Sequence, residues 1–92
     1  MDQIATTKLT IINALGLHAR AATLLVQTAS RFESELYISK DGRQINGKSI
    51  MGVLLLTAGK GTEIQIEAVG SDCHDMIKAI ENLVKNKFGE EQ

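Results

Sequence analysis

The stretch that decides the fold is TEIQIEA, residues 62–68, in which polar and apolar side chains alternate. In a β-strand, successive side chains point to opposite faces, so Ile64, Ile66 and Ala68 share one face. A strand with one apolar and one polar face is typical of an antiparallel sheet that is covered on one side and wet on the other. The stretch therefore predicts an open-faced sheet.

Apolar periodicity extends this pattern along the chain. Alternating segments predict strands over residues 8–13, 35–40 and 43–46, and stripes with helical spacing predict helices from Ala19, over residues 50–56 and from Cys73. The dipeptide Asp41-Gly42 favours a hairpin turn, which makes the second and third strands antiparallel neighbours. The run Gly70-Ser71-Asp72 is predicted to end the strand before it and to cap the last helix. The order βαββαβα predicts an α+β fold, an open-faced two-layer sandwich with a four-stranded antiparallel sheet and three helices on one face.

Composition limits the class of protein. The chain has 92 residues, 43% of them apolar and 23% charged, which is typical of one globular domain over residues 1–92. Its last four residues, 89–92, are predicted to form a frayed tail. A net charge of −1 and few aromatic residues argue against a nucleic-acid binder. The first seven residues lack the apolar core of a secretory leader, and no apolar run is long enough to cross a bilayer. We expect a cytoplasmic monomer that enters no membrane.

The residues with metal-binding side chains do not form a recognisable site. The single cysteine, Cys73, excludes an internal disulfide and falls on the apolar stripe of the last helix. His74 follows it directly, and adjacent residues on a helix point apart, so the two are not expected to share an ion. We expect neither a metal nor an organic cofactor.

The candidate functional site is the run GLHARAA, residues 16–22, at the start of the first helix. His18 falls at the N-cap, where Ser, Thr, Asp or Asn would normally accept the unpaired N–H groups of the first turn. Arg20 places a cation in that turn, at the positive end of the helix dipole. A helix start with no anionic cap, and with the N–H groups of Ala19 and Arg20 exposed, predicts a socket for an anion such as phosphate.

This placement of His18 suits phosphoryl chemistry. The helix dipole disfavours a protonated imidazole, and a neutral imidazole keeps the lone pair that attacks a phosphoryl group. Once attached, the group would accept the N–H groups of Ala19 and Arg20 and lie against the Arg20 guanidinium. The alternative is an ordinary surface histidine beside a solvated arginine, because a bare His-x-Arg is a common pattern.

Two motifs together resemble a known family. Residues 16–20, GLHAR, followed by Ala22 and Thr23, resemble the active-site motif of the histidine-containing phosphocarrier (HPr) family of the bacterial phosphoenolpyruvate-dependent sugar phosphotransferase system. The segment GKSIMGV, residues 47–53, resembles the regulatory-serine motif of the same family. Their spacing and the order of the elements match too, so the resemblance covers residues 8–88. It implies the strand order 1-4-2-3.

The resemblance implies a role for each motif. His18 would accept a phosphoryl group on Nδ1 from the phosphohistidine of enzyme I, which phosphoenolpyruvate charges, and would donate it to a IIA-type acceptor. Arg20 would steady the group. Ser49 would be the target of an ATP-dependent kinase, HPr kinase/phosphorylase, and phospho-Ser49 would bind a transcription regulator. Such a chain is a relay rather than an enzyme, because each half-reaction needs a partner's active site.

The sequence leaves three alternatives open. The first alternative is that the chain belongs to the nitrogen-related branch of phosphocarriers. The family often has proline where this chain has Ala21, and HARAA is similar to the nitrogen-related phosphocarriers, whereas the serine segment is similar to the sugar branch. In the second alternative His18 is idle and the chain is a regulatory binding module that acts through phospho-Ser49. Ser is also a favoured helix cap, so Ser49 is expected to have a structural role in either case. A generic α+β ligand-binding domain, the third alternative, explains the fold but neither motif.

The short helix over residues 50–56 is predicted to contribute an exposed apolar surface. It carries more apolar side chains than one sheet face can bury, so some of Ile50, Met51 and Leu54 would stay exposed. We assign Val53 and Leu56 to the core.

This surface is predicted to dock partner proteins. Leu24, on the first helix, falls well off the buried stripe and would extend the surface. Lys48 and Arg20 would ring it with positive charge and steer acidic partners. The predicted docking residues are Thr23, Leu24, Lys48, Ile50, Met51 and Leu54.

Overall fold

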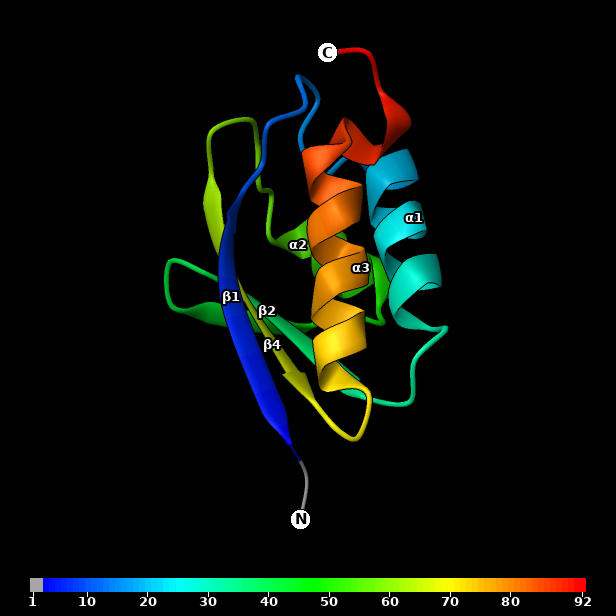
Figure 1. Ribbon diagram of the computed structural model, residues 1–92. Helices are drawn as coiled ribbons and strands as arrows, with labels where there is room; N and C mark the ends of the chain where they lie inside the picture. The colour runs from blue at the N-terminus through cyan, green and yellow to red at the C-terminus, as the bar shows by residue number, and fades with distance from the viewer. Residues whose placement is uncertain (1–2) are drawn as a thin grey trace.

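A four-stranded antiparallel sheet carries the helices on one face in the computed structural model, which describes residues 3–92 (Figure 1). The elements are β1 (Ile4–Thr10), α1 (Ala19–Ala29), β2 (Glu35–Lys40), β3 (Arg43–Asn46), α2 (Ile50–Leu55), β4 (Glu63–Val69), α3 (Cys73–Lys85) and a short 3₁₀ segment, η1 (Lys87–Gly89). The sheet order is β1-β4-β2-β3, and every neighbouring pair is antiparallel. The predicted open-faced α+β sandwich and its strand order are confirmed.

The register of β4 explains why its apolar residues fix the sheet. Ile64 lies opposite Leu9 of β1, and Ile66 lies opposite Ile38 of β2. All four side chains are buried on the face that the helices cover. The polar residues of β4 point to the other face, which stays open. The apolar residues of β4 therefore lie on the same buried face as the apolar residues of both neighbouring strands, β1 and β2.

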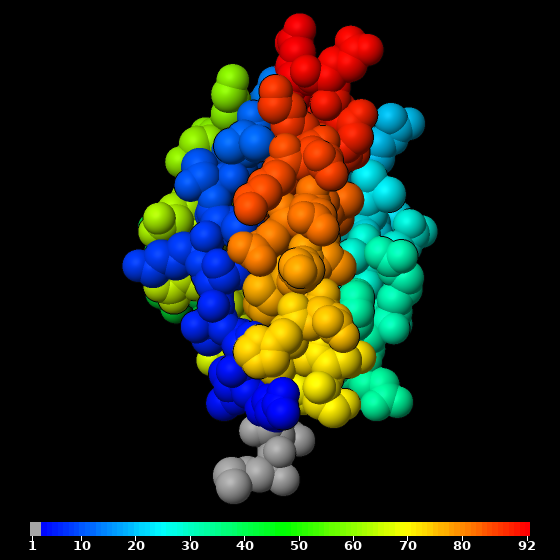
Figure 2. Space-filling view, viewed as in Figure 1, coloured from blue at the N-terminus to red at the C-terminus, as the bar shows by residue number. Residues whose placement is uncertain are grey.

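The core lies between the sheet and two long helices. The buried face of α1 is built from Ala21, Ala22, Leu25 and Ala29. The buried face of α3 is built from Cys73, Met76, Ile77, Ile80 and Val84. In Figure 2, α3 runs between β1 and α1 across the face in view. Leu25 and Ile80 are fully buried, and each such side chain contributes about 1.5–3 kcal/mol of hydrophobic stabilisation.

The first strand begins earlier than its sequence pattern predicted. We expected it over residues 8–13, and β1 runs from Ile4 to Thr10. Its inward positions include Ala5 and Thr7, which are small, so the apolar alternation before Leu9 is too weak to recognise. β1 ends at Thr10, and the next residue, Ile11, is fully buried and its carbonyl accepts the N–H of Gly61 at 2.7 Å.

The predicted start of α3 is confirmed, but the side chain of Asp72 does not cap the helix, which corrects that part of the prediction. Asp72 lies at the N-cap position, but its carboxylate makes no capping hydrogen bond. The carboxylate instead accepts the N–H groups of Glu33 and Ser34, each at 2.9 Å, and the hydroxyl of Ser34 at 2.5 Å. These bonds, that of the Ser34 hydroxyl first, lower the pKa of Asp72. Asp72 thus fastens the loop between α1 and β2 to the start of α3.

Residues 89–92 are not a frayed tail, which is a second correction. Phe88 is 4% exposed and anchors the segment in the core. Beyond it, the N–H of Ala14 donates to the carbonyl oxygen of Gln92 at 2.9 Å, and the Glu90 side chain contacts His18. The C-terminal segment accordingly lies beside the start of α1 in Figure 1. None of the helices among residues 3–92 is long and apolar enough to cross a membrane.

Candidate functional site

A tight turn before α1 positions His18. Gly16 has a φ of +66°, and a Cβ there would lie 2.6 Å from the carbonyl oxygen of Ala58. Leu17 is buried, and its N–H donates to that same oxygen at 2.9 Å. The turn and the buried leucine fix the backbone on both sides of the bend, so His18 follows in an extended conformation with φ −75° and ψ 178°.

His18 is the N-cap residue of α1, and its side chain makes no capping hydrogen bond. The first intrahelical bond runs from the N–H of Ala22 to the carbonyl of His18 at 2.8 Å. The N–H groups of the residues between them have no acceptor within the helix. Ala19 and Arg20 are both exposed, and the first turn contains no acidic residue. The helix start therefore offers donors and a guanidinium to an anion from solvent.

The most direct contact of the His18 ring comes from Glu90, which sequence reasoning missed. The Nε2 atom of His18 lies 2.5 Å from Oε2 of Glu90, and the two side chains are 27% and 17% exposed. Nδ2 of Asn13 donates to both Glu90 carboxylate oxygens, at 3.1 and 3.2 Å, and to the carbonyl of Gly16 at 2.9 Å. The hydrogen bond from His18 lowers the pKa of Glu90, and that from Asn13 lowers it further.

Ser49 caps α2 as the sequence predicted. Its Oγ accepts the N–H of Gly52 at 3.0 Å from an extended backbone with φ −113°. The side chain stays partly accessible, and the hydroxyl proton is left unused by the cap. Gly47 enters the turn before it, where its N–H donates to the carbonyl of Leu36 at 2.6 Å. α2 packs against α1, so the helix that Ser49 caps borders the helix whose N-cap residue is His18.

The short helix α2 leaves part of its apolar surface in solvent. Ile50 and Met51 are 40% and 70% exposed, in line with the sequence analysis. Leu54 is half-buried and packs on the core, whereas its neighbour Leu55 is 57% exposed. Val53 is fully buried, as expected. Six residues make less than two turns, so the exposed stripe cannot be placed from periodicity alone.

The other predicted docking residues are less exposed than expected. Leu24 is half-buried against the core, and Thr23 donates its hydroxyl to the carbonyl of Ala19 at 2.8 Å. The ammonium group of Lys48 donates to the carbonyl of Phe32 at 2.9 Å and is therefore tied to the protein rather than extended toward a partner. Leu15, which no sequence pattern marks as a docking residue, is 70% exposed in the loop that leads to His18.

The amino-acid sequence of the chain matches a known family over most of its length. The family described as "PTS HPr component phosphorylation site" matches residues 5–86. The chain belongs to the HPr family. Its members include the phosphocarrier protein HPr of Neisseria meningitidis serogroup A, which is 49% identical over 80 residues, 87% of this chain and 90% of that protein. The HPr of Xylella fastidiosa strain Temecula1 is 49% identical over 84 residues, 91% of this chain and 94% of that protein.

A solved HPr structure has the same architecture. The crystal structure of HPr from Thermoanaerobacter tengcongensis superimposes with a TM-score of 0.93 at 43% identity, covering 96% of this chain and 99% of that one. As a member of this family, the chain is a phosphocarrier of the phosphotransferase system. The resemblance seen in the two sequence motifs is thereby confirmed.

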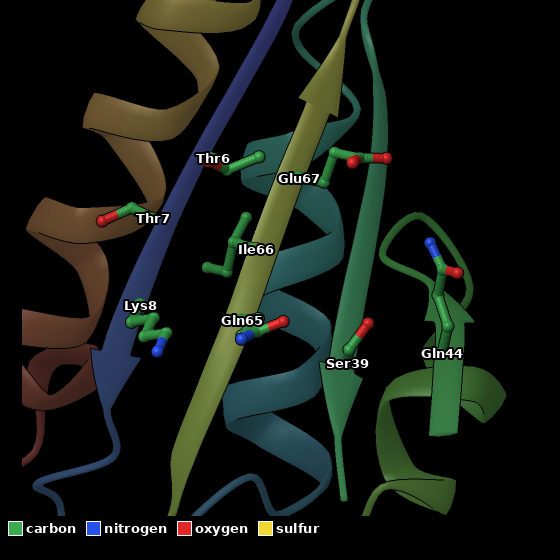
Figure 3. A pocket seen from close by; sticks show the side chains of 8 residues that line it. All are labelled: Thr6, Thr7, Lys8, Ser39, Gln44, Gln65, Ile66 and Glu67. Atoms are coloured by element: carbon green, nitrogen blue, oxygen red, sulfur yellow. The ribbon is translucent and has the colours of Figure 1, made fainter. Parts of the chain in front are cut away.

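A shallow groove of about 350 Å³ lies away from this HPr site, on the open face of the sheet. Figure 3 shows its side chains on all four strands, with helices behind the sheet. Its lining residues are Thr6, Thr7, Lys8, Ser39, Gln44, Gln65, Ile66 and Glu67. Within residues 3–92, no three His, Cys, Asp or Glu side chains come together as metal ligands. Cys73 is buried, and His74 is exposed.

Proposed function

We propose that His18 carries the phosphoryl group, on Nδ1, between the phosphohistidine of enzyme I and a IIA-type acceptor. The observation that supports this role is the uncapped N-terminus of α1, where His18 is the N-cap residue, Ala19 and Arg20 are exposed, and the first turn contains no acidic residue. The chain would act as a relay that needs a partner's active site for each half-reaction, and no cofactor is required.

The transfer exchanges one nitrogen–phosphorus bond for another. The Nδ1 lone pair of His18 forms a bond to phosphorus while the bond between phosphorus and the donor histidine nitrogen breaks, and its electron pair stays with the donor. The incoming oxygens would accept the N–H groups of Ala19 and Arg20, and the Arg20 guanidinium would pair with them. Solvent screens these charges at the exposed helix start, so the group is held loosely enough to be passed on.

Intact mass after incubation with phosphoenolpyruvate and enzyme I tests the acceptor. We expect a gain of one phosphoryl group that is labile in mild acid and stable in alkali. The gain should disappear in His18→Ala and persist in His74→Ala, which removes the other histidine, an exposed one. Labelling that survives His18→Ala would assign the acceptor elsewhere.

The same assay separates the two branches of phosphotransferase system. Ala21 follows Arg20, as in nitrogen-related phosphocarriers, while the serine segment is similar to the sugar branch. We propose the sugar branch, because the whole segment GKSIMGV, residues 47–53, is similar to the regulatory-serine motif of that branch. Faster labelling by a sugar-branch enzyme I than by a nitrogen-branch enzyme I is the expected result, and the reverse order would assign the nitrogen branch.

Ser49 is proposed as a regulatory phosphorylation site for an ATP-dependent kinase. Its hydroxyl caps α2 and borders the exposed Ile50 and Met51, so a phosphate there would add negative charge beside the proposed docking surface. An acidic partner would be repelled without refolding of the carrier. Ser49→Asp should weaken binding to enzyme I and leave the circular dichroism spectrum unchanged. A collapsed spectrum would show that the charge acts through the fold instead.

A further inference from the structure

A strained turn brings the C-terminal segment back to the helix start. Lys87 and Phe88 have φ angles of 56° and 55°, in the left-handed region that residues other than glycine rarely adopt. Gly89 follows with φ 80°. Phe88 is buried, so the turn is held in place by the core, and the chain emerges from it with Glu90 over His18. A strained backbone that directs one side chain to a site is often part of the function of that site.

Asn13 holds the Glu90 carboxylate by hydrogen bonds, while its own side-chain oxygen remains unpaired within the described part of the chain. Its side chain is fully buried, and Nδ2 donates to Glu90 and to the carbonyl of Gly16. Among residues 3–92, its Oδ1 has no hydrogen-bond partner. An unpaired buried acceptor is unfavourable, so stability alone does not explain an asparagine here. The bonds from Nδ2 orient Glu90 as well as the turn that precedes His18.

We infer that Glu90 is a positioning residue for phosphoryl transfer, acting through the His18 ring. This inference rests on the proposed role of His18 as the acceptor. A carboxylate accepts hydrogen bonds but does not donate them, so Glu90 keeps the ring proton on Nε2. The lone pair then lies on Nδ1, the nitrogen that attacks. The bond also fixes the rotation of the ring, which aims Nδ1 away from Glu90.

The same contact balances charge when the group arrives. As the Nδ1–phosphorus bond forms and the donor bond breaks, the ring keeps its Nε2 proton and becomes an imidazolium. No proton has to leave, and the positive charge is created next to the Glu90 carboxylate. Arg20 also helps to lower the pKa of Glu90, so the cation that would hold the phosphoryl group already belongs to this charged cluster. The carboxylate thus favours both the attacking ring and its product.

The first arm of the test needs no partner protein. We would record the ring nitrogen and proton signals of His18 by NMR in the wild type, in Glu90→Ala and in the matched control Glu91→Ala, which changes an exposed neighbouring glutamate. The wild type and the control should show an Nε2–H proton protected from exchange with water. Glu90→Ala should lose that protection. An unchanged signal in Glu90→Ala overturns the inference.

The second arm measures transfer from phosphorylated enzyme I. Glu90→Ala should lower kcat by about tenfold and leave KM unchanged, which is the lower end of the loss seen when a metal-ligating histidine loses the carboxylate that orients it. Glu90→Gln, whose amide oxygen still accepts a hydrogen bond, should recover part of the loss, and Glu91→Ala should match the wild type. Unchanged or increased kcat in Glu90→Ala overturns the inference. If the wild type itself takes up no phosphoryl group, the proposed function fails instead.

Discussion

The carboxylate of Asp72 accepts a 2.5 Å hydrogen bond from the hydroxyl of Ser34, which lies 38 residues earlier in the chain. The same carboxylate accepts the backbone N–H groups of Ser34 and Glu33. Ser34 is buried, whereas Asp72 is partly exposed. The contact ties the loop between α1 and β2 to the start of α3, and its strength depends on the charge of one carboxylate.

Asp72 should make the free energy of unfolding depend on pH. Its hydrogen bonds lower the folded-state pKa below the unfolded value of about 3.9, so the folded state binds the proton less readily. The stabilisation is complete above the unfolded pKa and is lost as pH falls through the folded pKa. Asp72→Asn should therefore differ from the wild type in urea unfolding midpoint at pH 7, and the difference should shrink toward pH 2. If the difference in urea midpoint between the two proteins stayed constant from pH 7 to pH 2, the charge of Asp72 would not be the source of the stabilisation.

The sheet and helices could be predicted from the sequence because apolar periodicity and turn residues favoured the same structure. Alternation in β4 and the Asp41-Gly42 turn both favoured the structure that formed. Asp41 and Gly42 take φ angles of 50° and 81°, as a two-residue hairpin turn of this kind requires. β1 was misplaced because Ala5 and Thr7 are too small to mark its inward face.

The site could be predicted only where it is contiguous in sequence. His18 and Arg20 are close neighbours in the chain, and the broken capping rule is visible in the residues themselves. Glu90 lies 72 residues from His18 and is one of 11 acidic residues, with no local pattern that separates it from the others. Its contact depends on the left-handed turn at Lys87 and Phe88, which the residue types do not suggest. The contact between Ser34 and Asp72 could not be predicted either, because the two residues are also far apart in the sequence and no local pattern links them.

Loss of the Ser49 cap should destabilise the protein modestly. Ser49→Ala removes the acceptor for the N–H of Gly52, and such a loss costs about 1 kcal/mol. Ser71→Ala is the control, because Ser71 is exposed and a surface change of this kind usually stays within about 0.5 kcal/mol. Chemical denaturation measures both. Equal stabilities of the two variants would show that the cap contributes little to the fold.

Gly70 should not tolerate a side chain. It has a φ of +147°, and a Cβ there would lie 2.5 Å from Oγ and 2.8 Å from Cα of Ser34. Gly70→Ala should lower the free energy of unfolding by about 1–3 kcal/mol from backbone strain alone, and more if the loop that Asp72 holds must shift. Gly59→Ala adds the same methyl group where nothing lies within 4 Å, and it should be neutral or slightly stabilising. Thermal unfolding of both variants measures the difference. A lower midpoint for Gly59→Ala than for Gly70→Ala would contradict this expectation.

Met51 should matter for partner docking and not for stability. Its side chain is 70% exposed on α2, next to the exposed Ile50, whereas Ile4 is 61% exposed at the outer strand of the sheet. Met51→Asp should raise KM for transfer from phosphorylated enzyme I by on the order of tenfold, because loss of a central apolar contact costs more than about 1 kcal/mol of binding. Ile4→Asp introduces the same charge at a similar exposure and should leave KM unchanged. If both variants raise KM equally, net charge rather than a surface centred on α2 governs the encounter, and the exposed side chains of α2 need another explanation.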